Sequence, residues 1–319
     1  MLVRVQTSGA KPPLFFVHGL HGVMPLGRDF ADVLGPEQPL YAVNANGLDG
    51  RRPVTNTMRD TLPIYMEEIE EARPAGPIVV GGMCDGAWPA IEIARAFRLR
   101  GRQVGPVILA DPPVMARSYA SQDAAHDPVP QVADDPAVIE ITRKLQEKAR
   151  NAGAPTSRDT PDLKNLKPEL ERQLYQQVQK QMLAYASRPY LSMPFDPADA
   201  NQLHLAALAG VGSLIALCTH LPTPFPGPAQ LILSDRRALG FFHREMPWHV
   251  LLPGARMVTV LPGDHIDLFG TGRRHVARAI RFMLEQGPRL QSLAELGTRS
   301  GTPTIPRSGA SGDAVARQA

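Results

Sequence analysis

Short apolar runs alternate with segments of helical periodicity over the first 110 residues. The runs have the length and near-continuous apolar character of strands buried on both faces, at 14–17, 39–43, 78–80 and 107–110. Between them, helices are predicted around 30–34, at 58–73 and at 87–99. This alternation predicts an α/β fold with a mostly parallel central sheet and helices on both faces.

The alternation stops near residue 114 and resumes at residue 229. In between, helices are predicted at about 137–152, 168–185 and 197–217, with no strand separating them. We therefore expect residues 114–228 to form a helical lid insertion. Two more strands, at 229–234 and 256–261, and an amphipathic helix at 275–285 complete the pattern.

The core domain is accordingly predicted to comprise residues 1–113 and 229–286. From 287 to 319 the chain is rich in Gly, Ser, Thr, Pro and Arg, which predicts a disordered C-terminal tail.

The composition and charge of the chain argue against several classes of protein. A net charge of +3 over 319 residues gives no indication of nucleic-acid binding. The longest apolar stretch, 203–221, is interrupted by Gly, Ser, Thr and His, so we expect no membrane span, and the N-terminus lacks the pattern of a signal peptide. Two cysteines, Cys84 and Cys218, make no disulfide framework. We expect a cytoplasmic protein with free thiols, in which Cys218 only packs.

Candidate chemistry begins at the pentad Gly82-Met83-Cys84-Asp85-Gly86, which lies between a predicted strand and a predicted helix. A strand, a tight glycine turn and a helix with a nucleophile at the apex form the nucleophile elbow of α/β-hydrolases. Glycines are needed there because the strained turn leaves no room for neighbouring Cβ atoms. The pentad predicts Cys84 as the nucleophile.

A nucleophile of this kind needs a base and an acid, in the chain order nucleophile, acid, histidine. His265 follows the last predicted strand and precedes the last helix, which makes it the candidate base. Two carboxylates end strands in the right part of the chain: Asp111 after the strand that follows the elbow, and Asp235 after the next one. We favour Asp111 and keep Asp235 as the alternative acid.

The oxyanion hole is expected to consist of two backbone N–H groups. One belongs to Asp85, the residue after the nucleophile, and the other to the turn at 18–22, with Leu20 as the candidate. His18 and His21 in the same turn are expected to be structural or to line a pocket.

Taken together, four segments resemble the type I thioesterase domains that end polyketide and non-ribosomal peptide assembly lines. They are the first strand at 13–19, the second strand and loop at 39–50, the elbow and its helix at 76–95, and the histidine motif at 262–265. The resemblance implies an α/β-hydrolase fold, an acid at Asp111 and a lid that shapes an acyl chamber. It also implies a donor acyl group on the phosphopantetheine of a carrier protein, with no cofactor or metal of the enzyme's own.

Two positions depart from the family pattern. Ala87 replaces a second glycine, which a helix start can absorb, and Cys84 replaces the usual serine. An acyl-cysteine is a thioester like the donor, so loading is close to isoenergetic and the acyl group stays reactive. We therefore expect release by transfer to an amine or hydroxyl, including cyclisation, or to water, with thiolate formation assisted by His265 and the helix N-terminus. A serine replaced by cysteine to trap an acyl-enzyme would give the same pentad.

Other classes of function remain open from the sequence. A polyester synthase also uses a cysteine elbow and would favour Asp235 as acid, and a cysteine lactone hydrolase or a non-catalytic ligand-binding protein with this fold are further alternatives. For the carrier partner, Arg51-Arg52 and the arginine-rich end of the elbow helix are basic surface candidates, although an ordinary solvated surface explains them as well.

Overall fold

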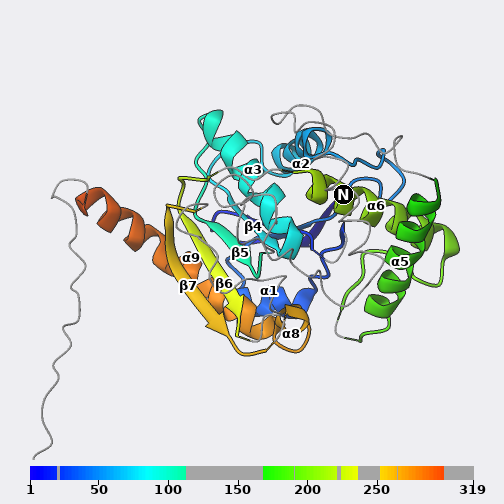
Figure 1. Ribbon diagram of the computed structural model, residues 1–319. Helices are drawn as coiled ribbons and strands as arrows, with labels where there is room; N and C mark the ends of the chain where they lie inside the picture. The colour runs from blue at the N-terminus through cyan, green and yellow to red at the C-terminus, as the bar shows by residue number, and fades with distance from the viewer. Residues whose placement is uncertain are drawn as a thin grey trace, which may run out of the picture.

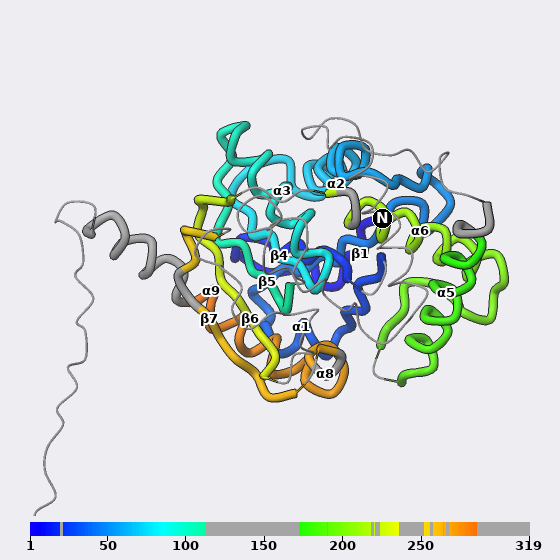
Figure 2. Tube along the Cα trace, viewed as in Figure 1, coloured from blue at the N-terminus to red at the C-terminus, as the bar shows by residue number. Residues whose placement is uncertain are grey.

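The computed structural model describes residues 1–19, 22–112, 168–189, 191–220, 224–235, 252–263 and 265–297. Figures 1 and 2 show these residues as a central sheet between two layers of helices, with two further helices, α5 and α6, beside it.

The sheet has seven strands in the order β1-β3-β2-β4-β5-β6-β7. All neighbouring strands are parallel except the edge pair β1 and β3. The strands are β1 (Leu2–Gln6), β2 (Leu14–Val17), β3 (Leu40–Val43), β4 (Val79–Met83), β5 (Val107–Ala110), β6 (Ala229–Ser234) and β7 (Ala255–Leu261). The predicted mostly parallel sheet is therefore confirmed, and β1 is the strand that sequence reasoning missed.

Helices cover both faces of this sheet (Figure 1). On one face lie α2 (Met58–Ala72) and α3 (Ala87–Leu99), and on the other α1 (Arg28–Leu34), α8 (His265–Phe269) and α9 (Arg273–Gly297). Successive β2 side chains alternate between the two cores: Phe15 packs with the α2 and α3 layer, and Phe16 with the α1 and α9 layer. Apolar residues on both faces explain why the strands read as continuous apolar runs.

The segment predicted as a lid contains α5 (Pro168–Ala186) and α6 (Ala200–Thr219), close to the predicted helices at 168–185 and 197–217. The predicted helix at 137–152 lies outside the described residues. The α6 helix packs tightly against the body of the protein, because a Cβ at Gly212 would meet the backbone oxygen of Thr55. Residues Ala200–Leu217 are long and apolar enough to cross a membrane, but 56% of this window is buried within the protein, as in the core helix of a globular domain.

The last helix corrects the prediction for the C-terminus. Disorder was predicted from residue 287, yet α9 continues through Gly297. The prediction rests on the composition of 287–319 as a whole, but residues 289–297 are mainly Leu, Gln, Ala and Glu, which favour helix, with leucines three residues apart. The prediction of disorder was wrong for 287–297, and residues 298–319 lie outside the described part of the chain.

Candidate active site

Cys84 occupies the sharp turn between β4 and α3. Its φ of 49° lies in the left-handed region, which costs a non-glycine residue on the order of 1–3 kcal/mol. The glycines on either side make this turn possible: a Cβ at Gly82 would meet the backbone oxygen of Gly86, and one at Gly86 would meet that of His18. The sequence therefore builds a strained elbow with Cys84 at its apex.

Asp111 and His265 meet at the same edge of the sheet. Asp111 ends β5, is fully buried and has a φ of 47°. Its Oδ2 lies 3.0 Å from Nδ1 of His265, the first residue of α8. With Nδ1–H donating to the carboxylate, Nε2 keeps its lone pair, which is the tautomer that a general base needs.

Ser234, at the end of β6, holds the Asp111 carboxylate from the other side. Its backbone N–H donates to Oδ1 at 2.8 Å, and its hydroxyl donates to Oδ2 at 2.6 Å. Sequence reasoning missed this residue. The parallel pairing of Ala110 with Ile232 places it there, because it sets the ends of β5 and β6 side by side.

Asp235 has a different position from the one the alternative assignment requires. Its Oδ1 accepts a hydrogen bond from the backbone N–H of Gly263 at 2.8 Å, two residues before the histidine. Gly263 has a φ of 118°. Asp235 thus braces the turn that leads to His265, while Asp111 contacts the imidazole itself.

The side chain of Cys84 lies in surroundings that disfavour its ionised form. Burial raises its pKa well above the usual range, and the negative charge of Asp85 raises it further, whereas a backbone hydrogen bond from Asp85 lowers it by less. The net effect of these surroundings disfavours the thiolate.

Two groups close to Cys84 carry unusual electrostatics. Burial raises the pKa of Asp85 to about 6, and the charge of His265 opposes this effect. Burial also raises the pKa of Tyr185, with contributions from the charges of Cys84 and Asp85, and Tyr185 packs against the same apolar cluster as Cys84. Tyr185 was not among the predicted site residues, because nothing in the local sequence marks it.

The first-strand turn lies close to the elbow. A Cβ at Gly19 would lie 2.9 Å from the backbone oxygen of Met83 and 3.0 Å from the Cβ of Cys84. Leu20, the predicted second donor of the oxyanion hole, and His21 lie outside the described residues. His18 is buried, its Nε2 lies 2.7 Å from the Tyr65 hydroxyl, and burial lowers its pKa to about 3, so the ring is neutral.

Within the described residues, no group of three or more His, Cys, Asp or Glu side chains could hold a metal ion. The Cys218 side chain lies outside the described part of α6.

A parallel sheet with a cysteine elbow and a strand-end Asp beside a loop His defines the class of α/β-hydrolases. The model of the thioesterase domain family matches residues 12–283, and the chain belongs to this family.

Relatives and solved structures agree with this assignment. The chain is 23% identical over 280 residues to atromentin synthetase of Tapinella panuoides, covering 84% of this chain and 27% of the relative. It is 36% identical over 107 residues to malpibaldin synthetase of Mortierella alpina, covering 34% of this chain and 2% of the relative. The chain thus spans far less than two thirds of these relatives.

Solved structures share the fold. A four-domain nonribosomal peptide synthetase, holo-AB3403, matches with a TM-score of 0.61 and 23% identity, over 88% of this chain and 20% of that one. The Vlm2 thioesterase domain with a bound dodecadepsipeptide matches with a TM-score of 0.60 and 15% identity, over 90% and 98%. The type II thioesterase BorB from the borrelidin cluster matches with a TM-score of 0.55 and 16% identity, over 89% and 97%.

Proposed function

We propose that this protein takes an acyl group from a carrier-protein thioester onto Cys84 and releases it to an amine, a hydroxyl or water, in the biosynthesis of a peptide or polyketide. The observation that carries the proposal is Cys84 on a strained elbow, at the same sheet edge as the Asp111–His265 pair at 3.0 Å. Membership of the thioesterase domain family supports thioester chemistry.

In the proposed loading step, Nε2 of His265 takes the proton of the Cys84 thiol as the sulfur attacks the thioester carbonyl. The backbone N–H groups of Asp85 and Leu20 stabilise the oxyanion. The C–S bond to the phosphopantetheine breaks, and its sulfur leaves with the proton from His265. Asp111, held by Ser234, keeps the imidazole in the required tautomer and stabilises its charged form.

In the release step, an amine, hydroxyl or water attacks the acyl-cysteine and gives its proton to His265, which returns it to the Cys84 sulfur. Because the acyl-enzyme is itself a thioester, little free energy is lost on loading. The acyl group keeps its reactivity toward weak or constrained acceptors, which favours amide, lactone or lactam formation over a serine-type hydrolysis.

The acid assignment separates this proposal from the polyester-synthase alternative. That alternative favours Asp235 as acid, but Asp235 Oδ1 bonds the Gly263 backbone, and the imidazole contacts Asp111. The geometry therefore supports the thioesterase reading better.

The basic surface adds little support for carrier docking. Arg52 donates to Glu67 at 2.6 Å, and Arg100 donates to Glu70 at 3.1 Å. Arg102 donates to backbone carbonyls of Arg73 and Gly76. The carrier partner is proposed from the family and the thioester chemistry, and not from this patch.

The test is to incubate the protein with acyl thioesters of N-acetylcysteamine and of a loaded carrier protein, and to measure the mass of the intact protein. A mass increase equal to the acyl group is expected on the native chain and not on Cys84→Ala. Product analysis with and without added amines then identifies the acceptor. Absence of the adduct from all acyl donors, or its retention in Cys84→Ala, would contradict the proposal.

A further inference from the structure

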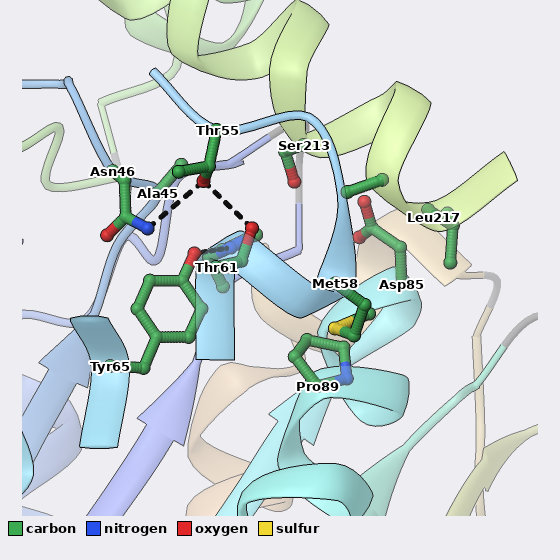
Figure 3. A pocket seen from close by; sticks show the side chains of 12 residues that line it. Ala45, Asn46, Thr55, Met58, Thr61, Tyr65, Asp85, Pro89, Ser213 and Leu217 are labelled. Carbon is green, nitrogen blue, oxygen red and sulfur yellow. Dashed lines mark hydrogen bonds between the residues drawn. The ribbon is translucent and has the colours of Figure 1, made fainter. Parts of the chain in front are cut away.

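A small cavity with several polar groups in its wall lies next to Cys84, between the elbow, the start of α2 and the helix α6 (Figure 3). Its volume is about 20 Å³. A water-sized group needs roughly 10–15 Å³ on this scale, so the cavity fits one such head group. Asp85 and Pro89 line it from the elbow and α3, and Ser213 and Leu217 line it from α6.

Two threonine hydroxyls on one wall donate their hydrogens to acceptors outside the cavity space. Nδ2 of Asn46 donates to Oγ1 of Thr55 at 3.1 Å. The Thr61 hydroxyl donates to the backbone oxygen of Thr57 at 2.7 Å, so the 2.8 Å contact between Thr55 and Thr61 uses the hydrogen of Thr55. This directed chain, drawn in part in Figure 3, leaves neither threonine hydroxyl with a hydrogen to donate into the cavity.

Several hydrogen-bond acceptors at the cavity have no donor among the described residues. Oδ1 of Asp85 and Oδ1 of Asn46 are buried and have no hydrogen-bond partner. The two residues are only 6% and 2% exposed, and Figure 3 shows the Asp85 carboxylate turned toward α6. Nδ1 of His18 also lacks a partner, and a neutral imidazole can present a lone pair there. Buried acceptors without a donor are costly, so these groups call for a ligand that donates several hydrogen bonds.

The cavity also lacks a balancing positive charge among its described lining residues. Of these, only His18 can become cationic, and burial keeps its pKa at about 3. An ionised Asp85 therefore presents a negative charge to this space with no cation among these lining residues. A buried carboxylate is stabilised by a cation that donates hydrogen bonds to it.

We propose that this cavity binds the primary ammonium group of a substrate, with Asp85 as its counter-ion and Asn46 as a second acceptor. An ammonium group has the size of the cavity, one positive charge and three N–H donors for the acceptors that line it. The group belongs either to the acyl chain loaded on Cys84 or to a free amine acceptor. The assignment as a substrate site rests on the proposed function, whereas binding of the ammonium group itself does not.

Binding is tested without catalysis by titrating the full chain with methylammonium at about pH 8 and following the backbone amide signals of Asp85, Gly86 and Ser213 by NMR. We expect saturable shifts with methylammonium and none with tetramethylammonium, which is larger and has no N–H. Asp85→Asn should raise the Kd at least about tenfold, since it removes a charged hydrogen-bond partner. Asp32→Asn, the same change at an exposed ion pair on α1, should leave the Kd unchanged.

A second variant acts from a different element and keeps the carboxylate. Ser213→Leu fills the cavity from α6 and should abolish the methylammonium shifts even if Asp85→Asn fails to fold. Absence of saturable shifts in the native chain would mean that the cavity holds only water and would overturn the proposal. Equal Kd values for Asp85→Asn and Asp32→Asn would do the same.

Two catalytic comparisons identify the source of the ammonium group. In the donor arm, the ratio of kcat/KM for an aminoacyl thioester over its des-amino analogue is compared between native protein and Ser213→Leu. In the acceptor arm, the ratio of amide to free acid from a des-amino donor and an added amine is compared in the same pair.

A fall of about tenfold in one ratio assigns the ammonium group to that substrate, and no fall in either overturns the substrate assignment. If the proposed function is wrong, no acyl adduct forms on Cys84. The methylammonium titration does not depend on that result and can still be interpreted.

Discussion

Replacing Asp85 with asparagine should stabilise the protein at neutral pH, and the gain should depend on pH in a defined way. Burial raises the pKa of Asp85 from 3.8 to about 6. A raised folded-state pKa means that the native state holds the proton more tightly than the unfolded state. Stability is therefore lost as pH rises through the window from about 4 to 6. About two pKa units correspond to about 3 kcal/mol, the expected gain of Asp85→Asn above pH 6.

His18 changes the stability with pH in the opposite direction over the same pH range. Burial lowers its pKa from 6.5 to about 3, so the unfolded state binds a proton that the native state refuses. Its contribution to stability is lost as pH falls from about 6.5 toward 3. In the native chain the two groups therefore oppose each other between about pH 4 and 6. In Asp85→Asn the contribution of Asp85 is gone and that of His18 remains. The free energy of unfolding should therefore rise with pH more steeply than in the native chain, by about 1.4 kcal/mol per pH unit.

The measurement is urea unfolding of both proteins at several pH values between about 4.5 and 8. The difference in free energy of unfolding should be about 1 kcal/mol at pH 4.5, rise through pH 5 and level off at about 3 kcal/mol above pH 6. Asp32→Asn, which changes an exposed carboxylate, serves as the control and should show no such rise. A constant difference across this range would refute the burial argument for Asp85.

Three further changes probe other parts of the site. Ser234→Ala removes the 2.6 Å hydrogen bond to Asp111. It should lower the free energy of unfolding by about 1.5–3 kcal/mol, measured by urea unfolding, and in steady-state kinetics it should change kcat more than KM. Ser187→Ala, at an exposed serine, should change both stability and kinetics little. Gly212→Ala places a Cβ against the backbone oxygen of Thr55 and should therefore lower the thermal unfolding midpoint. In an open helix position the same change would stabilise the protein by roughly 1 kcal/mol. A raised midpoint would show that α6 does not pack as described. Cys84→Ser should still form an acyl adduct but shift products from amide toward free acid, measured by mass spectrometry, and an unchanged product ratio would contradict the thioester argument.

Much of the fold could be predicted because its signals are local. The elbow needs only a strand, two glycines and a helix in sequence, and the apolar runs of the central strands identify themselves. The edge strand β1 was missed because it pairs with β3 on one side only, and Arg4 and Gln6 interrupt its apolar pattern. The extent of α9 was missed because the composition of 287–319 as a whole concealed the helix-favouring residues at 289–297.

The site depends on contacts that no local pattern contains. Both Asp111 and Asp235 end strands, so the sequence could rank them but not separate them by geometry. The parallel register of β5 and β6, together with the hydrogen bond from the Asp111 N–H to the Ile232 oxygen, decides which carboxylate meets the imidazole. Tyr185 lies about a hundred residues from Cys84 in sequence, and only the packing of α5 brings it to the nucleophile.

The electrostatics of Cys84 separate two reactions that are often used as equivalent tests of a cysteine nucleophile. Alkylation by iodoacetamide depends on the thiolate fraction, which burial and the Asp85 charge keep low. Acylation by a bound thioester can proceed from the thiol, because a base such as His265 takes the proton during attack.

We therefore expect Cys84 to be alkylated more slowly than glutathione at pH 7, while it is acylated by the matching acyl thioester within seconds to minutes. Peptide mass mapping of Cys84 after timed exposure to each reagent measures both rates. Alkylation as fast as that of glutathione would show that the thiol is already ionised and that the resting site holds a thiolate. Slow alkylation together with fast acylation would show that this cysteine works in the manner of a serine, activated only when its substrate is in place.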